Sequence, residues 1–116
     1  MIHVDSFLDR VPHAGYRCFD FVREVWLASF GEDVGDQLAG LDGSPRDRKL
    51  IPSELRLFRR LDAPVDPCFV VFQRHRTVPH IGIWYRGSVL HLAASGAQYT
   101  LLHFVSRPYS KVSYYL

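Results

Sequence analysis

Residues 16–31 read Tyr-Arg-Cys-Phe-Asp-Phe-Val-Arg-Glu-Val-Trp-Leu-Ala-Ser-Phe-Gly, and this stretch predicts the helix around which the chain is organised. Apolar side chains recur in it at the three-to-four-residue spacing of a helix that has one face in a core. That face holds Cys18, Val22, Val25 and Ser29, broadened by Phe19, Phe21 and Trp26. Gly31 follows the last periodic residue, where a residue in the left-handed conformation can close the final turn.

Cys18 falls in the first turn of this predicted helix. A thiol there meets the positive end of the helix dipole and unpaired backbone N–H groups, and both favour the nucleophilic thiolate. The alternative is a small core residue, because a cysteine on an apolar helix face often only packs. We interpret Asp20 as a charge at the helix start and not as a catalytic acid. A catalytic role for Cys18 therefore requires a base from elsewhere in the chain.

The composition of the 116 residues, 47% hydrophobic and 22% charged, predicts one ordinary globular domain over residues 1–116. A net charge of +2 from scattered basic residues does not favour nucleic-acid binding. No apolar run approaches the roughly 20 residues that cross a bilayer, and the N-terminus lacks the pattern of a secretory signal. The two cysteines, Cys18 and Cys68, are too few for a disulfide framework, and we interpret Cys68 as a buried strand residue.

The hydrophobic period predicts helices first and strands afterwards. After a brief turn or helix at 5–10 and the main helix, we expect a weak helix at 34–39 within a polar connection, 31–46, and a second helix at 53–61. Strands are predicted at 68–73, 80–85, 89–93, 99–104 and 112–115, and the aromatic tail (Tyr109, Tyr114 and Tyr115) is interpreted as edge-strand packing. This order predicts an α+β fold, with the opening helix packed on an antiparallel sheet of about five strands.

Two histidines on consecutive predicted strands are the candidate bases. A nucleophilic cysteine needs an imidazole within reach and a third group that orients it. If Arg86-Gly87 forms a two-residue hairpin turn, Gly82 lies opposite His91, and His80 becomes a diagonal neighbour of His91 on the same face. The two rings would then be close enough for a hydrogen bond. A three-residue turn would place them on opposite faces, and ordinary packing is the alternative role for each.

Two segments resemble the NlpC-type cell-wall peptidases, small papain-like enzymes that cleave peptidoglycan stem peptides. Tyr-Arg-Cys-Phe-Asp-Phe-Val-Arg-Glu-Val-Trp, from Tyr16, is similar to the family's nucleophile helix. His-Ile-Gly-Ile-Trp-Tyr-Arg-Gly-Ser-Val-Leu-His, from His80 to His91, is similar to its histidine segment. Within the family the likeness is closest to the short bacteriophage and prophage versions associated with tail tips.

The resemblance implies a papain-like fold and hydrolysis by a Cys18 thiolate, with His80 as general base and His91 as the residue that orients it. The backbone N–H of Cys18 would hold the oxyanion. Tyr16 is a candidate second oxyanion donor, and Trp84 is a candidate substrate contact. The resemblance implies no cofactor and no metal.

The implied substrate is a peptidoglycan stem peptide, and the implied partners are other tail-tip proteins, without nucleic acid or membrane insertion. We expect synthesis in the bacterial cytoplasm and a final place in the virion tail tip. Two alternatives stay open. One is a weakly active or inactive tail-assembly subunit that retains the fold. The other is a zinc site made by Cys18, His80 and His91, for which Asp20 would be a further ligand.

Overall fold

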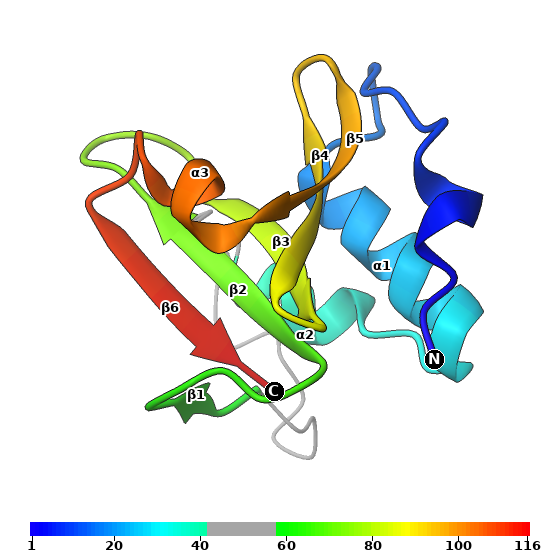
Figure 1. Cartoon of the computed structure of the whole chain (residues 1–116), viewed down its shortest axis with the longest axis horizontal. Coiled ribbons are helices and arrows are strands. Elements are labelled where there is room, and N and C mark those ends of the chain that lie inside the picture. The colour runs from blue at the N-terminus through cyan, green and yellow to red at the C-terminus, as the bar shows by residue number, and fades with distance from the viewer. Residues whose placement is uncertain (42–57) are drawn as a thin grey trace.

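The computed structural model describes residues 1–41 and 58–116, which form an α+β domain with one antiparallel sheet (Figure 1). A 3-10 helix, Val4–Phe7, comes first. The elements after it are α1 (Cys18–Phe30), α2 (Gly35–Ala39), β1 (Arg60–Leu61), β2 (Cys68–Gln73), β3 (His80–Tyr85), β4 (Ser88–Ala93), β5 (Gly96–Leu101), α3 (Leu102–Ser106) and β6 (Lys111–Tyr115). The sheet has six strands in the order β1-β6-β2-β3-β4-β5.

Helix α1 begins and ends as its sequence predicts. The backbone N–H of Arg17 donates to the Asp20 carboxylate at 2.8 Å, which confirms Asp20 as a helix-start residue. Gly31 has a φ of 70° and donates its N–H to the Leu27 carbonyl at 2.8 Å, which confirms the left-handed closure. The buried face holds Phe21, Val22, Val25 and Trp26.

The central hairpin also follows its prediction. Strands β2 and β3 have the predicted bounds, and Cys68 at the start of β2 is fully buried. Arg86 and Gly87 form the turn with φ values of 49° and 84°, the positive values that a two-residue hairpin turn requires. The resulting register pairs Gly82 with His91 and Trp84 with Val89.

The later strands differ from their prediction. Ala93 pairs with Gly96 and Ser88 with Leu101, so β5 starts after a two-residue turn and ends opposite the first residue of β4. The predicted strand at 99–104 is therefore wrong in its second half, where α3 begins instead. Strand β6 does not extend a simple meander but crosses over to pair with β2.

The predicted helix at 53–61 lies outside the described residues up to position 57. Its last two residues, Arg60 and Leu61, form strand β1 opposite Tyr115 and Tyr114, so the prediction is wrong there. Pairing with the edge of β6 outweighs the local helical pattern. The weak helix predicted at 34–39 is confirmed by α2, and positions 42–46 of the connection after it are not among the described residues.

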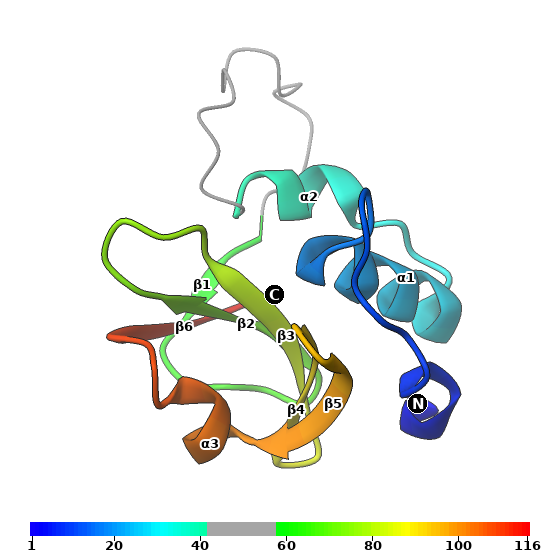
Figure 2. The same ribbon diagram turned by 90° about the horizontal axis from the view of Figure 1, so that it is seen from above.

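The sheet has two faces, covered by helices of different length (Figure 2). We call the first the α1 face, where α1 packs against Phe69, Val71, Ile81, Ile83, Leu90 and Leu92. We call the second the α3 face, where a smaller cluster contains Val70, Phe72, Val89 and Val105. Because side chains alternate along a strand, His80, Gly82 and His91 belong to the α3 face. No helix of the described residues is long and apolar enough to cross a membrane.

Candidate active site

His80 and His91 form the polar centre of the α3 face. Nε2 of His80 and Nδ1 of His91 are 2.8 Å apart, and the two rings meet nearly edge to face, at 84°. This confirms the predicted ring-to-ring hydrogen bond. Gly82 leaves the space that the bond needs, because a Cβ there would lie 2.5 Å from Val89 Cγ1 and 3.1 Å from His91 Cβ.

The protonation of this pair decides what it can do. Burial lowers the pKa of His80 to about 4 and that of His91 to about 4, and the charge of His80 adds to the effect on His91. Both rings are therefore neutral at neutral pH, and one proton lies between them. If His80 Nε2–H is the donor, Nδ1 of His80 carries no proton and can act as a base. The opposite tautomer leaves His80 without a basic nitrogen.

The Cys18 thiol lies half-buried at the first position of α1. Burial raises the pKa of the thiol, while hydrogen bonds from the backbone of Ile81, Phe19 and Cys18 itself oppose that rise. Burial is the larger effect. The electrostatics therefore favour a neutral thiol at rest and not the resting thiolate that its place in the helix predicts.

The thiol and the histidine pair share one neighbourhood. The backbone N–H of Ile81, the residue directly after His80, acts on the pKa of the thiol. Pairing of β3 with β4 ends at Gly82, so Ile81 lies beyond the β3–β4 ladder. Among the described residues no hydrogen bond joins the Cys18 thiol to either imidazole. Proton transfer from Cys18 to His80 therefore requires a closer approach of the two side chains, as is common for catalytic pairs in ligand-free sites.

Tyr109, which the sequence predicts to pack at an edge strand, completes this neighbourhood instead. Its ring stacks on His80, with 6.0 Å between centroids and 6° between planes. Burial raises the pKa of its phenol, and the charge of Cys18 raises it further, so Tyr109 lies near both groups. The crossover through α3 places it there. No sequence signal marks Tyr109 once that crossover is missed.

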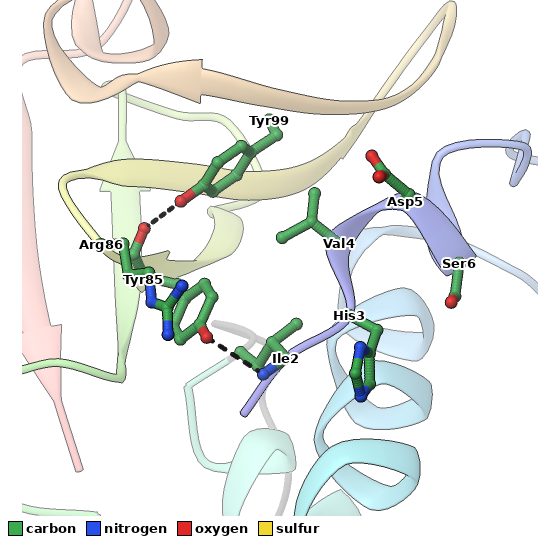
Figure 3. Close-up of a pocket in the computed structure, with 8 residues that line it drawn as sticks. All are labelled: Ile2, His3, Val4, Asp5, Ser6, Tyr85, Arg86 and Tyr99. Atoms are coloured by element: carbon green, nitrogen blue, oxygen red, sulfur yellow. Dashed lines mark hydrogen bonds between the residues drawn. The ribbon is translucent and has the colours of Figure 1, made fainter.

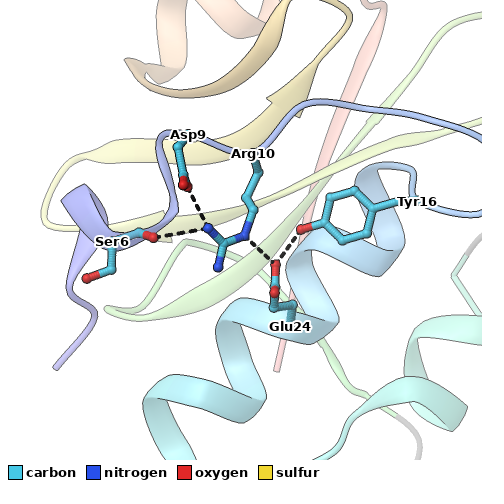
Figure 4. A network of polar contacts seen from close by, with 5 residues as sticks. All are labelled: Ser6, Asp9, Arg10, Tyr16 and Glu24. Atoms are coloured by element: carbon cyan, nitrogen blue, oxygen red, sulfur yellow. Dashed lines mark hydrogen bonds and ion pairs between the residues drawn. The ribbon is translucent and has the colours of Figure 1, made fainter.

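The other two predicted site residues lie elsewhere. The Tyr16 hydroxyl donates to Glu24, and Arg10 Nε donates to the same carboxylate oxygen at 3.1 Å (Figure 4). The Tyr16 hydroxyl has one proton, and that proton is donated to Glu24. Tyr16 can therefore serve as an oxyanion donor only if this hydrogen bond breaks. Trp84 packs half-buried against the α3-face cluster and does not line the groove beside the histidines.

The described surface has one hollow beside the histidine pair and another at the N-terminal segment. One, of about 350 Å³, borders the histidine pair and is lined by residues that include His80, His91, Gln98, Thr100, Phe104 and Tyr109. The other, of about 390 Å³, lies between the N-terminal segment and the β3–β4 turn (Figure 3). There Ile2 N–H donates to the Tyr85 hydroxyl at 3.3 Å, and none of the predicted site residues lines it.

A metal site finds no support in the part of the chain that the structure describes, where no three His, Cys, Asp or Glu residues form a group that could hold an ion. Asp20, the further ligand of the zinc alternative, instead accepts from the Arg17 backbone. No protein-family model, curated protein or solved structure matches the chain. A function for this site therefore rests on its residues and their geometry.

Proposed function

We propose that the protein is a cysteine peptidase of the NlpC type, with Cys18 as nucleophile, His80 as general base and His91 as the positioning residue. The observation that carries this proposal is the His80–His91 hydrogen bond of 2.8 Å beside a cysteine that opens a helix. A cysteine, a base and a third group that orients the base are the parts that nucleophilic acyl transfer needs.

The proposed reaction starts from neutral groups. His80 Nδ1 takes the thiol proton as the Cys18 sulfur attacks the scissile carbonyl, and the oxygen of that carbonyl becomes negative. The backbone N–H of Cys18, in the first turn of α1, lacks a partner within the helix and is the proposed oxyanion donor. His80 then gives the proton to the leaving amine as the C–N bond breaks, which leaves a thioester on Cys18. Water attacks the thioester with His80 again as base, the C–S bond breaks, and His80 returns the proton to the Cys18 sulfur as the carboxylic acid leaves.

The proposed substrate is a peptidoglycan stem peptide, and the proposed place of action is a bacteriophage tail tip. Both parts rest on the two sequence segments that resemble the peptidase family. A virion would carry the enzyme to the cell wall, and other tail-tip proteins would hold it there.

A second candidate is a tail-assembly subunit that retains the fold with little or no activity. Two observations favour it. Burial keeps the Cys18 thiol protonated at rest, and within the described residues the thiol makes no hydrogen bond to an imidazole.

Digestion of purified muropeptides by the isolated protein tests the proposal, with products identified by mass spectrometry. We expect Cys18→Ala to abolish cleavage and His80→Ala and His91→Ala to lower its rate by about 10²–10⁴-fold. His103→Ala is the matched control, because His103 is exposed on α3 and does not line the groove.

Alkylation by iodoacetamide at pH 7 separates the two candidates. Cys68 is fully buried, so modification reports Cys18, and Cys18→Ala gives the background. A peptidase should lose at least about tenfold in alkylation rate with His80→Ala, because the base then no longer generates thiolate. An equal rate in wild type and His80→Ala, together with no muropeptide cleavage, would establish the inactive subunit.

A further inference from the structure

Three rings on the α3 face form one cluster that includes the proposed base. Phe72 lies opposite His80 in the β2–β3 register, and the centroids of their rings are 5.9 Å apart. Tyr109 stacks on His80 with 6.0 Å between centroids and 6° between planes, and its centroid is 5.4 Å from that of Phe72. Each of the three rings therefore contacts the other two. His91 meets the His80 ring nearly edge to face, at 84°, so it holds the imidazole in a different way.

The hydrogen bond to His91 does not by itself fix the orientation of the His80 ring. The χ2 torsion of histidine is broad and has two wells, which exchange the positions of the ring nitrogens and carbons. One hydrogen bond at Nε2 selects between the wells but leaves the ring able to tilt about that bond. A nearly parallel neighbouring ring limits the tilt, because stacking favours one plane. Tyr109 therefore sets the plane of the His80 ring and His91 sets the direction of Nε2, and together they set where Nδ1 points.

The backbone around Tyr109 is held in place at two points. The Tyr109 N–H donates to the carbonyl of Ser106, the last residue of α3, at 3.0 Å. The N–H of the next residue, Ser110, donates to the carbonyl of Gln73 at 2.9 Å. Gln73 directly follows Phe72, whose ring is 0% exposed. The stacked ring therefore rests on a buried side chain and on a backbone tied to β2.

The contact with His80 depends on the ring of Tyr109 and not on its hydroxyl. Among the described residues no side-chain hydrogen bond involves that hydroxyl. The side chain is half-buried and lines the groove beside the histidine pair. A phenylalanine would keep the flat face that His80 contacts, whereas an aliphatic side chain would remove it.

We propose that Tyr109 is a positioning residue for His80. Its ring holds the imidazole in the plane in which Nε2 bonds to His91 and Nδ1 is left to take the Cys18 proton. The effect on cleavage rests on the proposed function, whereas the effect on the His80 ring does not. The alternative is that Tyr109 only packs the α3 crossover against the sheet.

Nuclear magnetic resonance on the whole chain with ¹⁵N-labelled histidine tests the proposal without catalysis. The readout is the scalar coupling between His80 Nε2 and His91 Nδ1 across their hydrogen bond. We expect wild type and Tyr109→Phe to show this coupling. Tyr109→Leu should lose it, and the ring-nitrogen signals of His80 should move towards the average of its two tautomers. Tyr109→Met should behave in the same way, and it fills much of the volume of the ring, so its effect does not come from lost packing.

Tyr114→Leu is the matched control for the loss of a ring. Tyr114 packs half-buried against the same α3-face cluster and lies opposite Val70 in the β2–β6 register, and within the described residues its ring does not stack on His80. This variant should keep the coupling. In muropeptide digestion, Tyr109→Leu should lower the cleavage rate on the order of 10–100-fold, because the base is misplaced, whereas Tyr109→Phe and Tyr114→Leu should stay close to wild type.

A coupling that persists in Tyr109→Leu and Tyr109→Met, or that is absent from wild type, would overturn the proposal. Its loss in Tyr109→Phe would do the same by assigning the effect to the hydroxyl, and its loss in Tyr114→Leu by assigning it to packing in general. Loss in the two ring-deleted Tyr109 variants alone, in a protein that cleaves no muropeptide, would retain the positioning role and refute only the peptidase.

Discussion

The two faces of the sheet share the same strands but differ in how completely a helix covers them. On the α1 face, Ile81, Ile83 and Leu90 are fully buried beneath a helix of 13 residues. On the α3 face, a helix of five residues covers only part of the surface, and the histidine pair borders an open groove. A helix of 13 residues therefore seals the α1 face, whereas a helix of five residues leaves part of the α3 face open.

Cys18 lies where the two faces meet. It is the first residue of the helix that covers the α1 face, yet the pKa of its thiol is affected by the backbone of Ile81, next to His80, whose side chain belongs to the α3 face. The backbone of Cys18 is held by helix α1, while its side chain lies near the open α3 face. Substitutions on the two faces should therefore differ in their effects on stability.

The largest expected effect is on the sealed face. Phe21→Ala removes a ring that is 0% exposed and should lower the free energy of unfolding by about 3–5 kcal/mol. Phe104→Ala on the α3 face removes a ring that is 51% exposed and should change it by less than about 1 kcal/mol. Urea denaturation measures both. Equal losses would refute the distinction between a sealed and an open face.

A smaller effect is expected at the glycine that separates the histidine strands. Gly82→Ala places a Cβ 2.5 Å from Val89 Cγ1, so the strands must shift, at an expected cost of about 1–3 kcal/mol. The shift should also disturb the His80–His91 bond and with it the imidazole resonances. The control is Gly40→Ala, whose added Cβ would meet its nearest atom at 3.4 Å. A Gly82→Ala protein as stable as the control would show that the space is not needed.

Acid should weaken the fold through the histidine pair. Burial lowers the folded-state pKa of His80 and of His91 to about 4, below the ordinary value of about 6.5. The unfolded chain therefore binds more protons between these values, and stability present above pH 6.5 is lost as the pH falls towards 4. Asp33, whose pKa its Arg23 partner lowers to about 2, titrates below this window.

Urea midpoints at pH 7.5 and pH 5 measure this loss. We expect His91→Gln to show a smaller difference between the two midpoints than wild type, because one buried titrating group is gone. His103→Gln, which alters an exposed histidine on α3, should keep the wild-type difference. A His91→Gln protein with the wild-type difference would contradict the neutral, buried pair.

The smallest effect is expected in the network that ties the N-terminal segment to α1 (Figure 4). Tyr16→Phe removes one hydrogen bond to Glu24, while Arg10 keeps its own, so the expected loss is about 0.5–1.5 kcal/mol in urea denaturation. Muropeptide cleavage should not change. A fall in cleavage rate of about 10²–10³-fold would instead identify Tyr16 as an oxyanion donor. Tyr115→Phe is the control, because its hydroxyl makes no side-chain hydrogen bond within the described residues.

Local patterns in the sequence were sufficient for much of the candidate site. The period of residues 16–31 predicted α1, and Gly31 marked its end, because both depend on neighbours within one or two turns. The Arg86-Gly87 turn fixed the register of β3 and β4, and register fixed the contact of His80 with His91. These features need no information from distant parts of the chain.

Features that depend on distant contacts were missed. The last two residues of the predicted second helix form β1 because they pair with the free edge of β6. The bounds of β5 follow from its pairing with β4 along the whole length of that strand. Tyr109 reached His80 only through the crossover by α3. The raised pKa of Cys18 likewise reflects burial by residues far along the chain, which local charge patterns do not reveal.

The sequence by itself determined the thiol-bearing helix, the histidine hairpin and the concentration of every Asp and Glu side chain in residues 1–66, since each depends on local order or composition. Only the tertiary structure decided that the histidines face the open side, that Tyr109 lies over one of them, and that His91 is left with a buried unpaired nitrogen. The physical reason is that burial and hydrogen-bond satisfaction depend on how the strands and helices pack together, and not on any one segment.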